Sequence, residues 1–228
     1  MKIARSVSYW LFVCCVPIFI LTSNIHCGVS MSKLYQYGFN KYQIDQVTGI
    51  DELELKMVAR HLADYFNARI DSAQITVVKE SEDFNLFNER EIVHLQDIRG
   101  LIKLDRWIQW GSLAIMIICS LVLLLRFRST WRILGKGLYQ GSLATLGFMI
   151  ILALWAVFGF EQLFLLFHLI SFSNQFWILD PARDYLIMLF PEGFFYDVAL
   201  FGFAAVMLQA LVLGGIAFGI LKSTGSKS

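Results

Sequence analysis

The stretch from residue 107 to residue 160 decides the fold. It reads WIQWGSLAIMIICSLVLLL (107–125), then RFRSTWRILGK (126–136), then GLYQGSLATLGFMIILALWAVFGF (137–160). A helix needs about 20 mostly apolar residues to cross a bilayer, and both outer runs reach that length without Asp, Glu, Lys or Arg. Each must be helical, because a backbone exposed to lipid has to satisfy its own hydrogen bonds. This stretch therefore predicts two transmembrane helices joined by a short basic loop.

Two further charge-free runs, Val7–Ile25 and Val198–Leu221, extend the same pattern. Of the 228 residues, 57% are hydrophobic and 16% are charged, whereas soluble domains are typically about 45–50% apolar and about 25% charged. This composition excludes a disordered chain, a collagen, a disulfide mini-protein and a nucleic-acid binder that works by bulk positive charge. We predict an α-helical integral membrane protein with four transmembrane helices at residues 7–26, 105–125, 137–160 and 198–221.

The positions of the charges predict the orientation in the membrane. With four spans, residues 1–6, 126–136 and 222–228 share one side and carry eight basic and no acidic residues: Lys2, Arg5, Arg126, Arg128, Arg132, Lys136, Lys222 and Lys227. All 18 Asp and Glu lie on the other side or at its edge. Basic residues mark the cytoplasmic face, so both termini are expected there. The first run resembles a signal peptide but lacks an A-x-A-like cleavage site, so we expect a retained anchor.

A fifth apolar run, Gln162–Leu179, is long enough to cross the membrane but contains several polar residues, His168 and Asn174 among them. Such side chains are unfavourable against lipid tails, and a fifth span would move the C-terminal lysines to the outer side. We therefore expect residues 161–197 to form an outer interfacial or re-entrant segment. Within it, Asp180 as N-cap and Pro181 as first residue predict a helix that ends near Phe190, before Pro191.

Residues 27–104 are too many for a simple loop and predict a small mixed α/β extracellular cap between the first two spans. Thr48–Arg69 has helical spacing of apolar residues, with Asp51 as its cap. Ile75–Val78 is a short β-type run, and a further strand is expected around Tyr35–Phe39.

A second cap helix should begin at Asn88, because Glu91 three residues later completes a capping box. His94 lies on this helix, with Glu91 and Asp97 three residues to either side. From His94 to Trp107 is 13 residues, roughly 20 Å of helix. We expect Gly100 to bend the helix so that His94 lies along the membrane surface.

Candidate chemistry gathers in the two outer segments. Histidine titrates near neutral pH and suits general acid–base catalysis, although His26 and His61 are expected to be structural. Arg183 either pairs with Asp180, Asp184 or Glu192, or anchors a lipid carbonyl or phosphate. No G-x-S-x-G elbow, P-loop, dinucleotide fingerprint or H-E-x-x-H motif is present in the sequence, and the spacing of the histidines does not establish a zinc site.

Two stretches, NEREIVHLQDI (88–98) and FHLISFSNQFWILDPARDYLIMLFPEGFFYD (167–197), are similar to a family of bacterial four-span membrane proteins that includes the lipoprotein intramolecular transacylase. The E-x-x-H-L-x-D pattern and the N-x-x-W-x-L-D-P…D-x-L-I-x-x-F-P-E pattern occur in the same order, and the topology agrees. Residues 28–85 contain no motif that we can match to the family.

The resemblance implies an acyltransferase of the bacterial cell membrane without cofactor or metal. It would move the sn-2 acyl chain of a diacylated lipoprotein to the α-amino group of its N-terminal cysteine, giving the lyso-form. The catalytic residues implied are His94 and His168. We add Glu91, Asp97, Asn174, Asp180 and Arg183 as supporting residues, with Phe176, Trp177, Tyr185, Phe194 and Phe195 as pocket walls. The partners expected are the lipoprotein and the bilayer, with no nucleic acid, and the protein is expected to be a monomer.

Which histidine acts as base is not decided by the sequence. We favour His94, because Glu91 or Asp97 could orient it as a carboxylate orients a catalytic imidazole. Two other functions remain open from the residues: a non-catalytic membrane sensor or assembly protein, and a metal-dependent lipid hydrolase.

Overall fold

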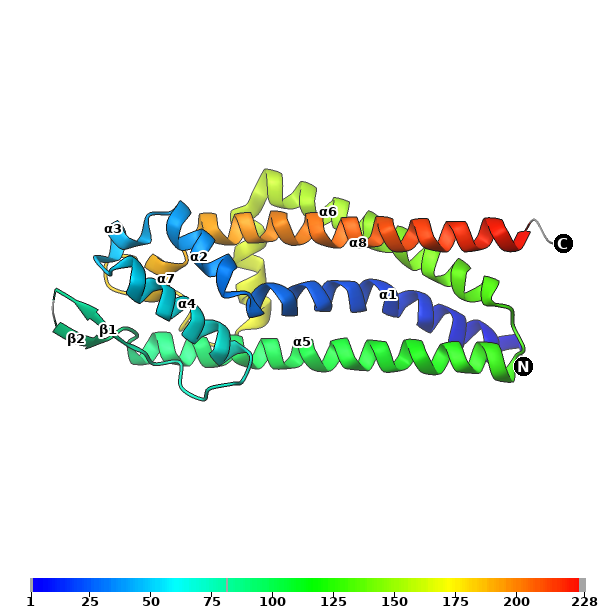
Figure 1. The fold of residues 1–228 in the computed structure, drawn as a ribbon, viewed down its shortest axis with the longest axis horizontal. Helices are drawn as coiled ribbons and strands as arrows, with labels where there is room; N and C mark the ends of the chain where they lie inside the picture. Colours follow the sequence, from blue (N-terminus) through cyan, green and yellow to red (C-terminus); the bar gives the residue numbers. More distant parts are fainter. Residues whose placement is uncertain (1, 81, 226–228) are drawn as a thin grey trace. The chain divides into compact units, whose positions relative to one another are not determined.

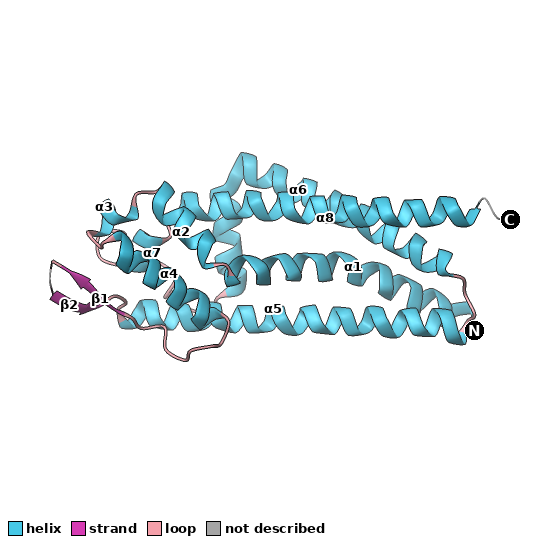
Figure 2. Ribbon diagram, in the orientation of Figure 1, coloured by secondary structure: helices cyan, strands magenta, loops and turns pink. Residues whose placement is uncertain are grey.

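The computed structural model describes residues 2–80 and 82–225 of the chain. Its elements are α1 (Lys2–Ser30), α2 (Ser32–Lys41), α3 (Ile44–Thr48), α4 (Glu52–Phe66), β1 (Thr76–Lys79), β2 (Glu82–Asn85), α5 (Glu89–Leu121), the π-helical turn η1 (Val122–Arg126), α6 (Trp131–Ser171), α7 (Tyr185–Leu189) and α8 (Glu192–Gly225) (Figure 1). Helices dominate, with one β-hairpin (Figure 2). Four helices are long and apolar enough to cross a membrane: α1, α5 with η1, α6 and α8. The four-span prediction is confirmed.

The chain folds into two compact units, which we describe separately. The helical unit comprises the described residues within 2–25, 105–157 and 200–225, and the cap unit comprises residues 26–104 and 158–199. The division between the units falls within α1, α5, α6 and α8, and α6 is kinked at Gly159. The cap was predicted to contain only the segment between the first two spans. In the structure, residues 158–199 fold with residues 26–104 into the same unit.

In the helical unit, small residues let α1 and α6 approach closely. A Cβ atom on Gly141 would lie 2.6 Å from Cβ of Val16, and one on Gly137 would lie 2.8 Å from Cδ1 of Phe12. Such small-residue contacts are a common way for helices to pack in lipid. Hydrogen bonds join Asn24 to Gln209 and Gln109 to Ser23, so α1 is linked to both α8 and α5.

The predicted strand around Tyr35–Phe39 is wrong, because these residues lie in α2. Tyr35, Gly38 and Phe39 are buried together, and their spacing of three and four residues matches one face of a helix rather than alternate faces of a strand. The apolar residues here follow the helical period of 3.6 residues and not the strand period of two.

The predicted helix Thr48–Arg69 begins later and ends earlier, as α4. Gly49 has φ +69° and closes the short helix α3, a conformation that glycine adopts without steric cost. Asp51 does occupy the N-cap position, but its side chain forms no capping hydrogen bond. The predicted apolar face is buried as expected, at Leu55, Val58, Leu62, Tyr65 and Phe66.

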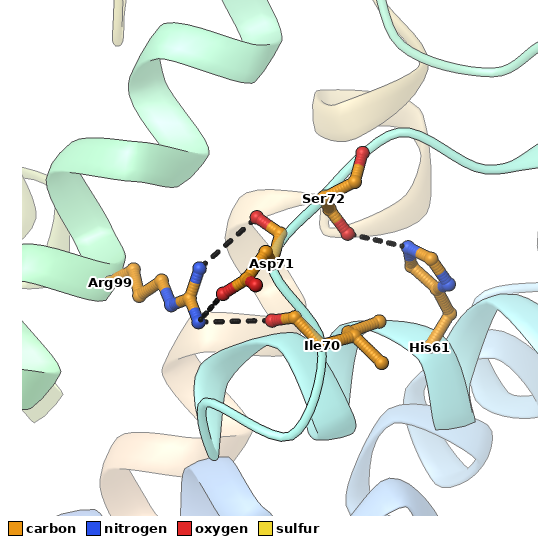
Figure 3. Close-up of polar contacts among 5 residues, drawn as sticks. All are labelled: His61, Ile70, Asp71, Ser72 and Arg99. Atoms are coloured by element: carbon orange, nitrogen blue, oxygen red, sulfur yellow. Dashed lines mark hydrogen bonds and ion pairs between the residues drawn. The ribbon is translucent and has the colours of Figure 1, made fainter.

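The β-type run at Ile75–Val78 is confirmed as β1, which pairs antiparallel with β2 in the register Val77 to Phe84. The partner strand was not predicted, because Glu82 and Asp83 lack the apolar alternation that marks a strand. Hydrogen bonds from two side chains, those of Arg99 and His61, hold the loop between α4 and β1 (Figure 3). Arg99 on α5 donates to the carbonyl oxygens of Ile70 and Asp71, at 2.9 and 3.1 Å, and Nε2 of His61 donates to that of Ser72 at 3.0 Å. His61 is thus a structural histidine.

The capping box at the start of α5 is confirmed. The backbone N–H of Asn88 donates to Oε2 of Glu91 at 2.8 Å, and the N–H of Glu91 donates to Oδ1 of Asn88 at 3.1 Å. The expected bend at Gly100 is wrong, because α5 is a continuous helix through this residue. Nothing approaches within 4 Å of where its Cβ would lie, so the neighbouring structure does not force a bend.

The helix predicted to begin at Pro181 begins instead at Tyr185, with Asp184 at the N-cap position. The N–H groups of Arg183 and Asp184 both donate to the carbonyl oxygen of Asp180, and Oδ2 of Asp184 accepts from the N–H of Asp180 at 2.7 Å. These bonds close residues 180–184 into a separate turn, so the Asp-Pro signal starts a turn and not a helix.

Candidate active site

His94 and His168 lie together inside the cap unit. His94 projects from α5 and His168 from the part of α6 that follows the kink at Gly159, and their imidazole centroids are 6.3 Å apart with an interplanar angle of 29°. Only 6% of His94 and 8% of His168 are exposed. Two residues 74 positions apart in the sequence therefore form one buried, roughly stacked pair.

The two imidazoles differ in their hydrogen bonds. Nδ1 of His168 lies 2.8 Å from the carbonyl oxygen of Phe164, one helical turn earlier. Since a carbonyl only accepts, Nδ1 carries the proton, and in the neutral ring Nε2 is left with the lone pair. Nδ1 of His94 is buried and has no hydrogen-bond partner among the described residues.

Burial keeps both rings neutral at physiological pH. Both histidines lie in the cap unit, outside the four predicted spans. The pKa of His94 is lowered to about 4, chiefly by loss of solvation and in smaller part by neighbouring His168, whereas Asp97 partly opposes the shift. Burial also lowers the pKa of His168, against the opposing effect of the hydrogen bond with Phe164. Two neutral imidazoles can accept and return protons without first losing one to solvent.

Aromatic rings surround the pair. Phe164 lies 4.3 Å from the centroid of His168 and Trp177 lies 4.8 Å from it, while Phe172 lies 4.9 Å from the centroid of His94. Phe167 contacts His168 at 5.4 Å. These rings exclude water and provide apolar surface, so the surroundings suit an acyl chain better than a polar ligand.

The turn that carries Trp177 is fixed to α5 on both sides of His94. Arg90, one helical turn before His94, donates to the carbonyl oxygen of Gln175 at 2.7 Å. Asp97, three residues after His94, accepts from Nδ2 of Asn174 at 2.8 Å. Oδ1 of Asn174 in turn accepts from the N–H of Phe176 at 3.0 Å, which closes the turn. The aromatic wall and His94 are thus held in one arrangement.

Comparison with models of protein families identifies the family of the chain. The model of a protein family described as lipoprotein intramolecular transacylase Lit matches residues 10–195. The chain belongs to this family. It is therefore a multi-pass membrane acyltransferase, a lipoprotein intramolecular transacylase. A comparison with curated proteins found no match.

Solved structures show the same fold. The membrane-integral lipoprotein intramolecular transacylase from Bacillus cereus superposes with a TM-score of 0.82 at 21% identity, over 100% of both chains. Two variants of that enzyme, in which one histidine is replaced by arginine or by alanine, superpose with a TM-score of 0.78 at 20% identity. They cover 100% and 99% of this chain, and 96% and 97% of their own.

In this transacylase, the other predicted supporting residues hold the scaffold. Glu91 is 1% exposed, and its oxygens accept from the N–H groups of Asn88 and Leu186, the latter at 2.6 Å. Neither Glu91 nor Asp97 hydrogen-bonds to His94 among the described residues, so the reason for favouring His94 as the base no longer holds. Arg183 pairs with Asp180 at 3.2 Å in an exposed position.

The predicted pocket walls of the transacylase divide into two groups. Trp177 contacts His168 directly, and Phe195 contacts Phe164 at 5.1 Å. Tyr185 packs on Phe84 in the cap core, and its hydroxyl oxygen accepts a hydrogen bond from Nζ of Lys79 at 3.1 Å. Phe194 packs on Phe190 in the same core, and Phe176 is 41% exposed. Among the described residues, no group of three or more His, Cys, Asp or Glu could hold a metal ion.

Sequence reasoning did not identify Phe164, Phe172 or Arg90 as parts of the site. Phe164 and Phe172 stand four residues before and after His168, a spacing that places them near its face of a helix. Arg90 stands four residues before His94 in the same way. The four-residue spacing of these side chains from each histidine could therefore have identified them.

Proposed function

We propose that this transacylase moves the sn-2 acyl chain of a diacylated bacterial lipoprotein to the α-amino group of the lipoprotein's own N-terminal cysteine. The product is an N-acylated lyso-form that keeps one ester-linked chain. The observation that carries the proposal is the buried histidine pair, 6.3 Å between centroids, inside an aromatic enclosure of a lipoprotein transacylase family member. The pair offers two proton-transfer groups at one place.

The reaction conserves its atoms within one substrate. The neutral amine nitrogen attacks the ester carbonyl carbon and forms the new C–N bond, while the carbonyl electrons move to oxygen. When this tetrahedral intermediate collapses, the bond to the sn-2 oxygen breaks and an amide forms. The nitrogen loses one proton and the sn-2 oxygen gains one, so a pair of imidazoles that relays a proton is sufficient for the balance.

We assign His168 as the base and His94 as the group that returns a proton to the departing oxygen. Nδ1–H of His168 is engaged by the carbonyl oxygen of Phe164 at 2.8 Å, which leaves Nε2 to take a proton from the attacking amine. This hydrogen bond does for His168 what an orienting acceptor does in a catalytic triad, since it sets both tautomer and ring direction. The assignment reverses the preference derived from the sequence.

Holding the two reacting groups together supplies a further part of the rate. Effective molarities in well-oriented intramolecular reactions reach about 10⁵–10⁸ M, and general acid–base catalysis typically contributes about 10²–10⁴-fold. The fixed aromatic wall around the histidines supports such positioning. Since amine and ester belong to one molecule, no covalent enzyme intermediate is needed.

We also propose that both termini lie in the cytoplasm, that the cap unit faces the outside, and that the protein acts as a monomer. The basic residues Arg126, Arg128 and Arg132 in and beside the turn between η1 and α6 support the orientation. Lys227 lies outside the described residues. The catalytic groups proposed here all come from one chain, which supports a monomer. Reporter fusions at the C-terminus test the orientation, and light scattering of the detergent-solubilised protein tests the monomer.

Alanine variants of each histidine test the proposal most simply. In cells that depend on this protein for lyso-form lipoprotein, His94→Ala and His168→Ala should each abolish the product, whereas His61→Ala, which removes a structural histidine of the same unit, should keep it. Tandem mass spectrometry of lipoprotein N-termini reads out the acyl position. Full lyso-form production by either of the first two variants would refute the two-histidine mechanism.

A further inference from the structure

The proposed reaction needs one more group than the histidine pair provides. The carbonyl oxygen becomes an oxyanion in the tetrahedral intermediate, and a preorganised hydrogen-bond donor at that oxygen is usually a large part of catalysis of acyl transfer. Nδ1–H of His168 is already donated to Phe164, and the mechanism uses His94 for the departing oxygen. A third donor beside the pair is therefore expected.

Trp177 is the residue with an uncommitted donor in contact with the pair. Its ring lies 4.8 Å from the His168 centroid at an interplanar angle of 36°, and it is half-buried. The indole Nε1–H can only donate, yet it has no acceptor among the residues described. A partly buried donor that contacts a catalytic ring and lacks a protein partner is suited to bind a substrate oxygen.

The tilted stacking of the two rings leaves this N–H free for a third group. An indole N–H lies in the plane of its ring, so a ring that stacks on His168 directs the bond past the imidazole instead of into it. A group that reacts at Nε2 of His168 must lie beside the imidazole edge. The carbonyl oxygen of the ester attacked by the amine would lie in that neighbourhood.

The turn that contains Trp177 is preorganised, as an oxyanion donor must be. The hydrogen bonds from Asn174 to Asp97 at 2.8 Å and from Arg90 to Gln175 at 2.7 Å fix the turn to α5. The N–H of Phe176 bonds to Asn174 at 3.0 Å, immediately before the tryptophan. A donor held in this way does not reorganise as charge develops.

We infer that Trp177 is a catalytic residue whose indole N–H donates a hydrogen bond to the acyl carbonyl oxygen and stabilises the oxyanion of the tetrahedral intermediate. This inference rests on the proposed acyl transfer at His94 and His168 and adds to it. It gives Trp177 a chemical role in addition to that of an apolar wall. The bonds that form and break are those of the transfer itself, and the hydrogen bond adds no reactant.

The test separates the N–H from the ring. Trp177→Phe removes the donor and part of the ring, and replacement of Trp177 by benzothienylalanine removes only the donor, because sulfur stands in place of N–H. Phe167→Leu is the control, since Phe167 also contacts His168 but carries no donor. Each full-length protein is assayed with a synthetic diacylated lipopeptide, and kcat and KM are measured separately.

Loss of one oxyanion donor typically lowers kcat by about 10²–10³-fold. We expect the benzothienylalanine protein to lose about 10²-fold in kcat with KM changed less than about threefold, and Phe167→Leu to lose far less in kcat. A benzothienylalanine protein with the kcat of the wild type would overturn the role of Trp177. If His94→Ala and His168→Ala were still inactive in that assay, the histidine mechanism would stand without it. If they were active, the proposed function itself would fail.

Discussion

The carboxylate of Glu91, on the first turn of α5, accepts a hydrogen bond of 2.6 Å from the backbone N–H of Leu186 in α7. Glu91 precedes His94 by one turn, while Leu186 follows Trp177 in the second outer segment. The bond therefore joins the two sequence stretches that carry the candidate site. The carboxylate of Glu91, predicted to orient the imidazole of His94, instead links α5 to α7 by a hydrogen bond.

Glu91→Ala should destabilise the cap unit. The substitution leaves the N–H groups of Asn88 and Leu186 without their acceptor, at a residue that is 1% exposed. Leaving the buried N–H of Leu186 unsatisfied costs about 1–3 kcal/mol, whereas the N–H of the exposed Asn88 can bond to water. A lower midpoint of thermal unfolding in detergent should reveal the loss, whereas the exposed neighbour Glu89→Ala should unfold like the wild type. Equal midpoints for both variants would show that the hydrogen bond between Glu91 and Leu186 does not stabilise the cap unit.

Asn174→Ala should slow the reaction more than it unfolds the protein. It removes the bond to Asp97 and opens the turn before Trp177. Hydrogen bonds of this kind contribute about 0.5–1.5 kcal/mol each, so a loss of about tenfold in kcat is expected from the displaced turn. Ser173→Ala, at an exposed position beside it, is the matched control. A variant that keeps the kcat of the wild type contradicts the positioning role.

Gly100→Ala should be tolerated and slightly stabilising. α5 is continuous through Gly100, and nothing lies within 4 Å of the added Cβ. Alanine in a helix interior is favoured over glycine by roughly 0.5–1 kcal/mol. Thermal unfolding and acyl-transfer assays should therefore show a higher midpoint with unchanged kcat. Loss of activity would indicate that catalysis requires the bend which the sequence led us to expect.

The pH dependence of kcat/KM should follow the substrate amine rather than the histidines. The pKa of His94 is lowered to about 4, mainly by burial, and burial also lowers the pKa of His168 from its ordinary value of 6.5, so neither imidazole should titrate in its ordinary range. A peptide α-amino group has a pKa of about 7.7–8.0, and only its neutral form attacks. We expect kcat/KM to fall with a slope of one as the pH drops from about 8 to about 6.5. A second ionisation between pH 6 and 7 would mean that a histidine titrates normally.

The transmembrane part and the N-terminal cap of α5 were predictable because local chemistry determines them. A charge-free run of about 20 residues has few alternatives in lipid, and Asn88 and Glu91 satisfy each other's backbone groups within one turn. The cap was less predictable. The five residues Tyr35–Phe39 are too few to distinguish the helical period from the strand period. The N–H of Asp184 donates to the carbonyl oxygen of Asp180, and the N–H of Asp180 donates to the carboxylate of Asp184, so these residues form a turn and no helix begins at Pro181.

The candidate site was predictable in its residue types but not in its contacts. Motif resemblance selected His94 and His168, whereas the motif does not specify the hydrogen-bond partners of the side chains in the site. Glu91 stands one turn from His94 in sequence, yet it bonds to Leu186, 95 residues away. His168 obtains its acceptor from Phe164, a backbone carbonyl that no side-chain pattern could specify.

The most direct test of intramolecular transfer is the mass and the fragmentation pattern of one defined lipopeptide before and after treatment with the purified protein. Transfer within a molecule is an isomerisation, so the account predicts an unchanged intact mass, with fragments that carry the moved acyl chain on the cysteine nitrogen. The His168→Ala protein should leave the chain on the sn-2 oxygen. A product that has lost an acyl chain and gained the elements of water, or an unaltered substrate with the wild-type protein, would contradict the account.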